Sequence, residues 1–176
     1  MALKPTIYKA RVSLVDLDRD LYESLSLTLA QHPSETIERM MVRLVVYCIY
    51  WHGDLAFTKG LSAVEEPDLW IRTLDDTISL WVDVGEPAAE RIKKATRLAS
   101  KTVVVCFNSK SDVWWNQNKQ KFDSLNVSVK RFAWDEVSAL PDLVQRTMEL
   151  TLTVSEGTVY LSGEKGDCEL SLTPLK

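Results

Sequence analysis

The sequence contains few of the residues that build cysteine- and histidine-based sites. Among its 176 residues are three cysteines and two histidines. The cysteines are widely separated, at Cys48, Cys106 and Cys168. Neither His32 nor His52 stands at a zinc-ligand spacing from a cysteine pair. An odd number of scattered cysteines in apolar or strand-like surroundings is typical of reduced, buried thiols. The composition argues against a zinc site, a disulfide framework, and Ser-His-Asp or Cys-His catalysis.

Long apolar runs are also missing. The longest, residues 44–51, is far shorter than the roughly 20 residues that a membrane-spanning helix requires. Residues 1–5 contain no apolar signal core and no small-residue cleavage site. We therefore expect a cytoplasmic protein without a membrane partner.

The sequence has no excess of basic residues and no nucleotide-binding motif. It carries 21 Lys and Arg against 25 Asp and Glu, a formal net charge of −4. This balance weighs against a protein that coats nucleic acid, although a local basic patch would still let an enzyme grip a short stretch. Neither G-x-x-x-x-G-K-S/T nor G-x-G-x-x-G occurs, which argues against a nucleotide cradle of those types.

What the sequence does contain is the composition of an ordinary globular domain. Hydrophobic residues make up 45% of the chain and charged residues 26%, which is enough apolar surface to form a core. No internal repeat, low-complexity tract or linker interrupts the chain. We therefore predict one domain over residues 1–176.

The hydrophobic pattern predicts a mixed α/β (α+β) fold, a mixed β-sheet with flanking helices. We expect strands at residues 6–15, 22–31, 67–74, 77–84, 102–107, 127–134, 148–154, 158–161 and 168–172, and helices at residues 34–51, 87–100, 109–122 and 135–145. The first two strands should pair as a hairpin, and Ser34 should cap the first helix. The strand–helix–strand order in the middle of the chain favours parallel pairing there, with antiparallel strands added at both ends.

Asp83 breaks the pattern of a buried strand. Residues 77–84 carry apolar side chains on both faces, which is typical of a central strand. An acid is disfavoured there unless it is paired or binds a metal. Asp83 also lies at the carboxyl end of its strand, where α/β sheets tend to bind ligands. The alternative is an exposed acid that helps to cap the next helix.

The first predicted helix carries two glutamates close to its apolar face. At about 100° per residue, Glu38 falls within the buried arc and Glu35 lies at its edge. The alternative is that both are ordinary carboxylates of an exposed first turn, with Glu35 paired to Arg39.

The helix predicted at residues 87–100 carries two cations at the edge of its buried stripe. From that flank, the long side chains of Arg91 and Lys94 can reach the strand end that carries Asp83, unless they are simple boundary residues. Carboxylate oxygens suit Mg²⁺. A nearby lysine or arginine could orient a metal-bound water or stabilise charge on a phosphoryl oxygen.

Several segments of the chain resemble the bacterial YaeQ family. They are residues 1–10 (MALKPTIYKA), 32–41 (HPSETIERMM), 57–61 (FTKGL), 91–95 (RIKKA), 107–109 (FNS) and 114–115 (WW). The resemblance covers essentially the whole chain. It implies a compact variation on the PD-(D/E)XK nuclease core, that is, a restriction-endonuclease-like core with additional antiparallel strands.

The resemblance also implies a set of site residues. Asp68, which follows a proline, and Asp83, on the next strand, match the two acids that bind metal in such sites. The lysine that usually stands two residues after the second acid is replaced here by Gly85. The resemblance implies a lysine moved to the following helix, with Lys94 as the first choice and Lys93 as the second.

A glutamate from the first core helix often completes such sites, and Glu35 or Glu38 matches that position. With Arg91 nearby, the set predicts a Mg²⁺-dependent nuclease or phosphodiesterase acting on nucleic acid. The sequence leaves the substrate and the oligomeric state open.

The alternative is a non-catalytic interaction or regulatory module on the same scaffold, motivated by the acidic net charge and the missing motif lysine. Such a module would bind a protein partner through an exposed patch that could include Trp114 or Trp115. Two tryptophans on a helix, however, more often pack in a core than stack on bases. A third possibility is a small anion bound near Arg91, Lys94 and the helix start at Pro87.

Overall fold

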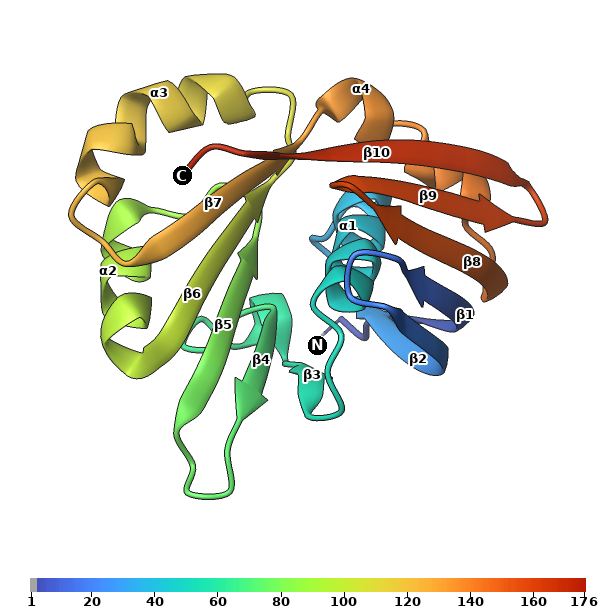
Figure 1. The fold of residues 1–176 in the computed structure, drawn as a ribbon, viewed down its shortest axis with the longest axis horizontal. Coiled ribbons are helices and arrows are strands. Elements are labelled where there is room, and N and C mark those ends of the chain that lie inside the picture. The colour runs from blue at the N-terminus through green and yellow to red at the C-terminus, as the bar shows by residue number, and fades with distance from the viewer. Residues whose placement is uncertain (1–2) are drawn as a thin grey trace. The chain divides into compact units, whose positions relative to one another are not determined.

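The computed structural model describes residues 3–176, which fall into two compact units of the chain (Figure 1). One unit comprises Met1–Ile49 and Ala133–Leu172, and the other comprises Tyr50–Phe132 and Thr173–Lys176. The described residues form ten β-strands, four α-helices and two short 3-10 helices. The protein therefore belongs to the α+β class, as predicted.

The predictions about a secretion signal, a membrane span and the number of domains concern the whole chain, whereas the structure describes residues 3–176. Met1 and Ala2, which open the segment used to argue against a secretion signal, lie outside the described residues. Every helix found between residues 3 and 176 is too short or too polar to cross a membrane. The single domain over residues 1–176 stays a prediction.

The first unit is a sheet with one buried helix. Its elements are β1 (Thr6–Asp16), β2 (Leu21–Gln31), α1 (Ile37–Ile49), α4 (Trp134–Val137), η2 (Leu140–Leu143), β8 (Thr147–Ser155), β9 (Thr158–Gly163) and β10 (Gly166–Pro174). The strand order is β2-β1-β8-β9-β10. The predicted β1–β2 hairpin is confirmed, and β8, β9 and β10 are also antiparallel. β1 and β8 run parallel, a pairing of distant segments that the sequence pattern did not predict.

The helix α1 is buried on nearly all sides, as its apolar pattern predicts. It begins later than expected, however. The hydroxyl of Thr36 accepts a hydrogen bond from the backbone N–H of Arg39 at 3.2 Å, so Thr36 caps the helix. The Ser34 hydroxyl lies 2.7 Å from Nδ1 of His32 instead. The predicted Ser34 cap is therefore wrong, because a nearby imidazole binds that hydroxyl.

The second unit combines parallel and antiparallel strands. Its elements are β3 (Leu55–Phe57), η1 (Gly60–Ser62), β4 (Leu69–Arg72), β5 (Ile78–Val84), α2 (Ala89–Leu98), β6 (Ala99–Cys106), α3 (Ser111–Phe122) and β7 (Val127–Phe132). The strand order is β7-β6-β5-β4-β3. β5, β6 and β7 are parallel, as predicted from the middle of the chain, and β3, β4 and β5 are antiparallel.

The helices α2 and α3 cover one face of the parallel strands (Figure 1). Ile92 of α2 and Phe122 of α3 pack with Val104 of β6 in a buried cluster. Trp114 and Trp115 pack against this cluster, with ring centroids 5.7 and 5.8 Å from that of Phe122. The two tryptophans are therefore half-buried packing residues and do not form the exposed aromatic patch considered above.

Further elements also differ from the sequence prediction. The helix expected at residues 135–145 is divided into α4 and η2, because Pro141 lies in the first turn of η2 and cannot continue an α-helix. The short strand β3 was not predicted, since three residues are too few to show an alternating pattern.

Candidate functional site

The side chain of Asp83 is buried in the second unit and bonded to a single arginine. Asp83 lies on β5, exposes 3% of its surface, and is paired with Val104 of β6, which packs against Ile92 of α2, so its side chain lies on the face that α2 covers. Nε of Arg91 donates to Oδ2 of Asp83 at 2.8 Å, and Nη2 donates to Oδ1 at 3.1 Å. The alternative of an exposed capping acid is thus wrong. The predicted reach of Arg91 from the flank of α2 to the end of β5 is observed.

The environment of Asp83 disfavours its ionised form. Burial raises the pKa of the Asp83 carboxyl, the hydrogen bonds and positive charge of Arg91 lower it, and the negative charge of Asp68 raises it again. Burial is the largest of these effects. Asp83 is therefore an acid whose ionised form needs Arg91.

Arg91 also connects Asp83 to the segment before β4. Its Nη2 donates to the backbone carbonyl of Glu66 at 2.8 Å, and its Nη1 donates to the carbonyl of Val64. The guanidinium carbon lies 5.7 Å from the centroid of the Trp81 ring, within cation–π range. One guanidinium group thus joins β5, α2 and the loop at residues 63–67.

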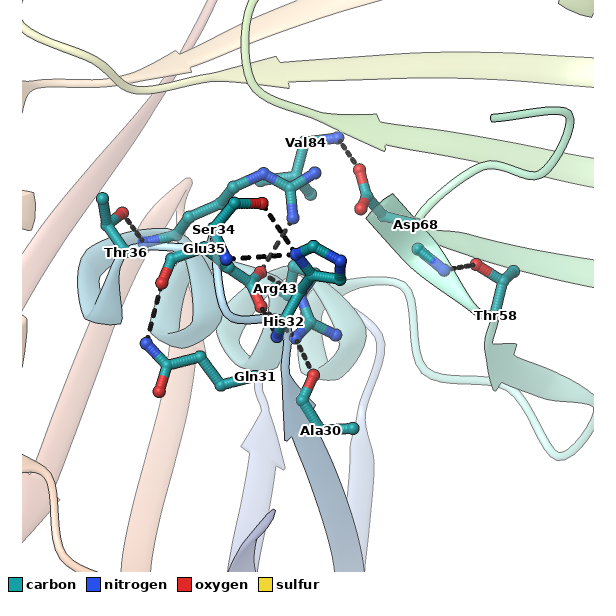
Figure 2. A network of polar contacts seen from close by, with 12 residues as sticks. Ala30, Gln31, His32, Ser34, Glu35, Thr36, Arg43, Thr58, Asp68 and Val84 are labelled. Carbon is teal, nitrogen blue, oxygen red and sulfur yellow. Dashed lines mark hydrogen bonds and ion pairs between the residues drawn. The ribbon is translucent and has the colours of Figure 1, made fainter. Parts of the chain in front are cut away.

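Asp68 lies beside Asp83, immediately before the neighbouring strand β4. The antiparallel register pairs Leu69 with Val82, so the next position along places Asp68 opposite Asp83. Oδ2 of Asp68 accepts the backbone N–H of Val84 at 2.7 Å (Figure 2). The structure therefore brings together Asp68, Asp83 and Arg91, a convergence that the linear sequence could not show.

In the first unit, Glu35 forms its own buried network. Its carboxylate accepts Nη1 of Arg39 at 2.8 Å and both Nε and Nη2 of Arg43, at 2.7 and 2.9 Å. Nη2 of Arg43 also donates to the carbonyl of Ala30, and the side chain of Gln31 donates to the carbonyl of Glu35 (Figure 2). The expected Glu35–Arg39 pair is confirmed, but Glu35 is buried rather than exposed.

Arg43 is the residue of this network that the sequence prediction missed. It exposes only 6% of its surface in the middle of α1, among apolar neighbours. The signal was present, because a single arginine within the apolar stretch of a buried helix requires a buried partner.

The remaining predicted site residues are less buried than these acids. Glu38 is half-buried in the first turn of α1. Lys93 and Lys94 are exposed on α2. Within residues 3–176, neither lysine forms a hydrogen bond or ion pair with Asp68 or Asp83, so the structure does not assign a motif lysine.

The carboxylates of Asp83 and Glu35 are both bonded to arginine guanidinium groups. Both carboxylate oxygens of Asp83 accept N–H groups of Arg91, and those of Glu35 accept N–H groups of Arg39 and Arg43. Nowhere between residues 3 and 176 do three His, Cys, Asp or Glu side chains converge as metal ligands. A cation at Asp83 would have to displace the guanidinium group, which already neutralises the charge that a metal ion needs.

Comparison with known proteins identifies the chain at the level of the family. The family model described as YaeQ protein matches residues 1–172. The chain belongs to the YaeQ family. The YaeQ proteins of Escherichia coli K12 and Salmonella typhi are each 42% identical to it over 175 residues, which cover 98% of this chain and 97% of theirs. The names of these YaeQ proteins state no activity.

Two solved YaeQ structures have the same fold. The crystal structure of YaeQ from Pseudomonas syringae matches with a TM-score of 0.93 and 38% identity, covering 98% of this chain and 96% of that one. YaeQ from Xanthomonas axonopodis pv. citri matches with a TM-score of 0.94 and 33% identity, covering 98% of each chain. The family resemblance found in the sequence is thereby confirmed.

Proposed function

We propose that this YaeQ protein is a non-catalytic protein-binding module on a nuclease-like scaffold, in which the Asp83–Arg91 pair organises a binding loop. The observation that carries the proposal is that the guanidinium group of Arg91 binds an acid and a loop together. Arg91 bonds both oxygens of Asp83 and, at the same time, the backbone carbonyls of Val64 and Glu66. The acid at the position of a nuclease metal ligand therefore serves to hold a loop.

The loop at residues 58–67 is internally hydrogen-bonded. The hydroxyl of Thr58 accepts the N–H of Gly60 at 2.9 Å and donates to the carbonyl of Pro67. The carboxylate of Glu66 accepts the N–H of Lys59 at 3.0 Å. A loop fixed in this way loses little conformational entropy when a partner binds, which favours affinity.

The same loop presents two apolar side chains to solvent. Leu61 exposes 43% of its surface and Val64 exposes 77%. Exposed apolar side chains on a pre-organised loop are suited to a shallow apolar recess on a protein partner. The acidic net charge of −4 is unsuited to a phosphate-rich partner and agrees with this choice.

Affinity capture from a lysate of the source bacterium tests the proposal when three forms of the protein are compared quantitatively. The amount of each protein captured by the wild type should fall at least about tenfold with Val64→Asp, because a charge at the centre of an apolar contact opposes binding. Leu98→Asp is the matched control, since Leu98 is a leucine of α2 that exposes 60% of its surface. A set of retained proteins that Val64→Asp leaves unchanged would rule out this loop.

A Mg²⁺-dependent phosphodiesterase is the second candidate, favoured by the adjacent buried acids Asp68 and Asp83. Calorimetric titration with Mg²⁺ and Mn²⁺ separates the two functions. The binding module should give no saturable heat in the wild type or in Asp83→Asn, and no cleavage of DNA or RNA. Saturable binding in the wild type that disappears in Asp83→Asn would establish the metal site and overturn the proposal.

A further inference from the structure

Among residues 3–176, the strand β2 lies at the edge of the first unit's sheet and has β1 as its one strand neighbour. It is 11 residues long, Leu21–Gln31, and ends the strand order next to β1. Its register with β1 is unbroken from Asp16↔Leu21 to Thr6↔Gln31. A long, regular edge strand of this kind offers a row of backbone groups to another strand.

The register shows which backbone groups point outward. The N–H of Lys9 donates to Arg146, and the N–H of Leu17, just beyond β1, donates to Val154, so the odd-numbered residues here bond toward β8. The even-numbered residues of β1 therefore bond to their odd-numbered partners on β2. It follows that the even-numbered residues of β2 direct their N–H and C=O groups away from the sheet.

A contact at Ala30 supports this assignment. Its carbonyl accepts Nη2 of Arg43 from α1 at 3.1 Å, which requires a carbonyl that β1 does not use. The other outward-facing residues from position 24 onward have small, exposed side chains: Ser24, Ser26 and Thr28.

This edge lacks the features with which monomeric proteins protect an edge strand. β2 contains no proline, no bulge and no lysine, and Glu23 is its one charged residue. The lysine next to it, Lys9 of β1, bonds the hydroxyl of Thr28. Small side chains at the outward-facing positions leave the backbone accessible to a second strand.

We propose that β2 pairs antiparallel with β2 of a second copy of this chain, about a two-fold axis at Ser26. Ser26 is the midpoint of the strand, so this register places all 11 residues opposite a partner, with the Ala30 carbonyl shared between Arg43 and the second strand. It places Glu23 opposite Leu29 of the second copy, and no two like charges face each other. A two-fold pairing uses the free edge of both copies and leaves neither open to further addition.

The same register covers exposed apolar side chains at both ends of the strand. Tyr22 exposes 63% of its surface and Ile7 exposes 42%. Tyr22 would lie opposite Ala30 of the second copy, and within each chain Ala30 pairs with Ile7. The small side chain of Ala30 leaves room for the phenol ring to extend toward Ile7. By symmetry this contact forms twice, which favours a second copy over an unrelated peptide.

Sedimentation velocity of the full chain over a concentration series tests the proposal. The wild type should dimerise, and Ser26→Lys and Ser26→Glu should each raise the dissociation constant at least about tenfold, because like charges meet at the axis. An equimolar mixture of the two variants should restore dimers, since Lys then faces Glu. Ser162→Lys is the matched control, because Ser162 is an exposed serine on β9, within the sheet.

A backbone variant adds a second readout. Ser26→Pro removes an outward N–H without removing a bond to β1, so it should lower dimerisation while circular dichroism and thermal unfolding remain close to wild type. A wild type that is monomeric at about 100 µM, well above micromolar affinity, would overturn the proposal. So would a dimer that Ser26→Lys and Ser26→Glu do not weaken.

Discussion

At the scale of single residues, Arg91 determines whether the charge of Asp83 can remain buried. Replacing Arg91 by alanine leaves that carboxylate without its cation and frees the carbonyls of Val64 and Glu66. We expect Arg91→Ala to lower the free energy of unfolding by about 3 kcal/mol, the lower end for a broken buried pair because Arg91 is itself part-exposed. Urea unfolding measures this. Arg97→Ala, at an exposed position of the same helix, should cost less than about 0.5 kcal/mol.

Asp83 should also make stability depend on pH in a defined direction. Burial raises the pKa of Asp83 above its ordinary value of 3.8, so the folded state binds the proton more tightly than the unfolded chain. That contribution is fully present below the ordinary pKa and is lost as the pH rises through the folded-state pKa. The free energy of unfolding of the wild type minus that of Asp83→Asn should therefore decrease as the pH rises from about 4 to 7. A constant difference in urea unfolding across these pH values would contradict this.

Much of this residue-scale arrangement could be read from the sequence. An acid in a strand that is apolar on both faces predicts a buried partner, and the flank of α2 narrows the choice to Arg91 or Lys94; the structure shows that the partner is Arg91. Glu35 was harder, because a first-turn glutamate has an ordinary explanation at the helix start. Its burial depends on Arg43, two helical turns away, and on the carbonyl of Ala30. Such three-part contacts depend on tertiary packing and not on local pattern.

At the scale of elements, the helix α1 is capped by Thr36 and not by Ser34, the residue that the sequence pattern favoured. Thr36→Ala should lower the free energy of unfolding by about 1 kcal/mol, because it removes the acceptor for the N–H of Arg39. Ser34→Ala should cost less than half of that, since its hydroxyl contacts His32 outside the helix. Thermal or urea unfolding of the two variants measures the difference. A larger loss for Ser34→Ala would mean that the first turn is organised differently.

Elements with strong periodicity were predictable, and those fixed by long-range pairing were not. The order of β5, α2, β6, α3 and β7 predicts parallel pairing, because crossover helices join parallel strands. The pairing of β1 with β8 was not predictable, since nothing in either strand encodes its distant neighbour. The three residues of β3 form a strand because β4 pairs with them in antiparallel orientation.

At the scale of the whole molecule, the three thiols should report on the two units separately. Cys48 lies in the first unit and Cys106 in the second; both are buried, and burial raises the pKa of each to about 12. Cys168 is half-buried, and its pKa is raised as well. In native protein at mildly alkaline pH, a thiol reagent should modify Cys168 first, and Cys48 and Cys106 only when their units open. Mass spectrometry of labelled peptides measures the order, and early labelling of Cys48 would contradict it.

The order of the segments along the chain has a consequence for synthesis on the ribosome. The sheet of the first unit joins Lys9 to Thr147 through the parallel β1–β8 pairing, with the main segment of the second unit, Tyr50–Phe132, between them. The β1–β2 hairpin and the apolar helix α1 therefore leave the exit tunnel long before β8 exists to cover them. The apolar surfaces of the segment translated first therefore stay uncovered until β8 has been synthesised.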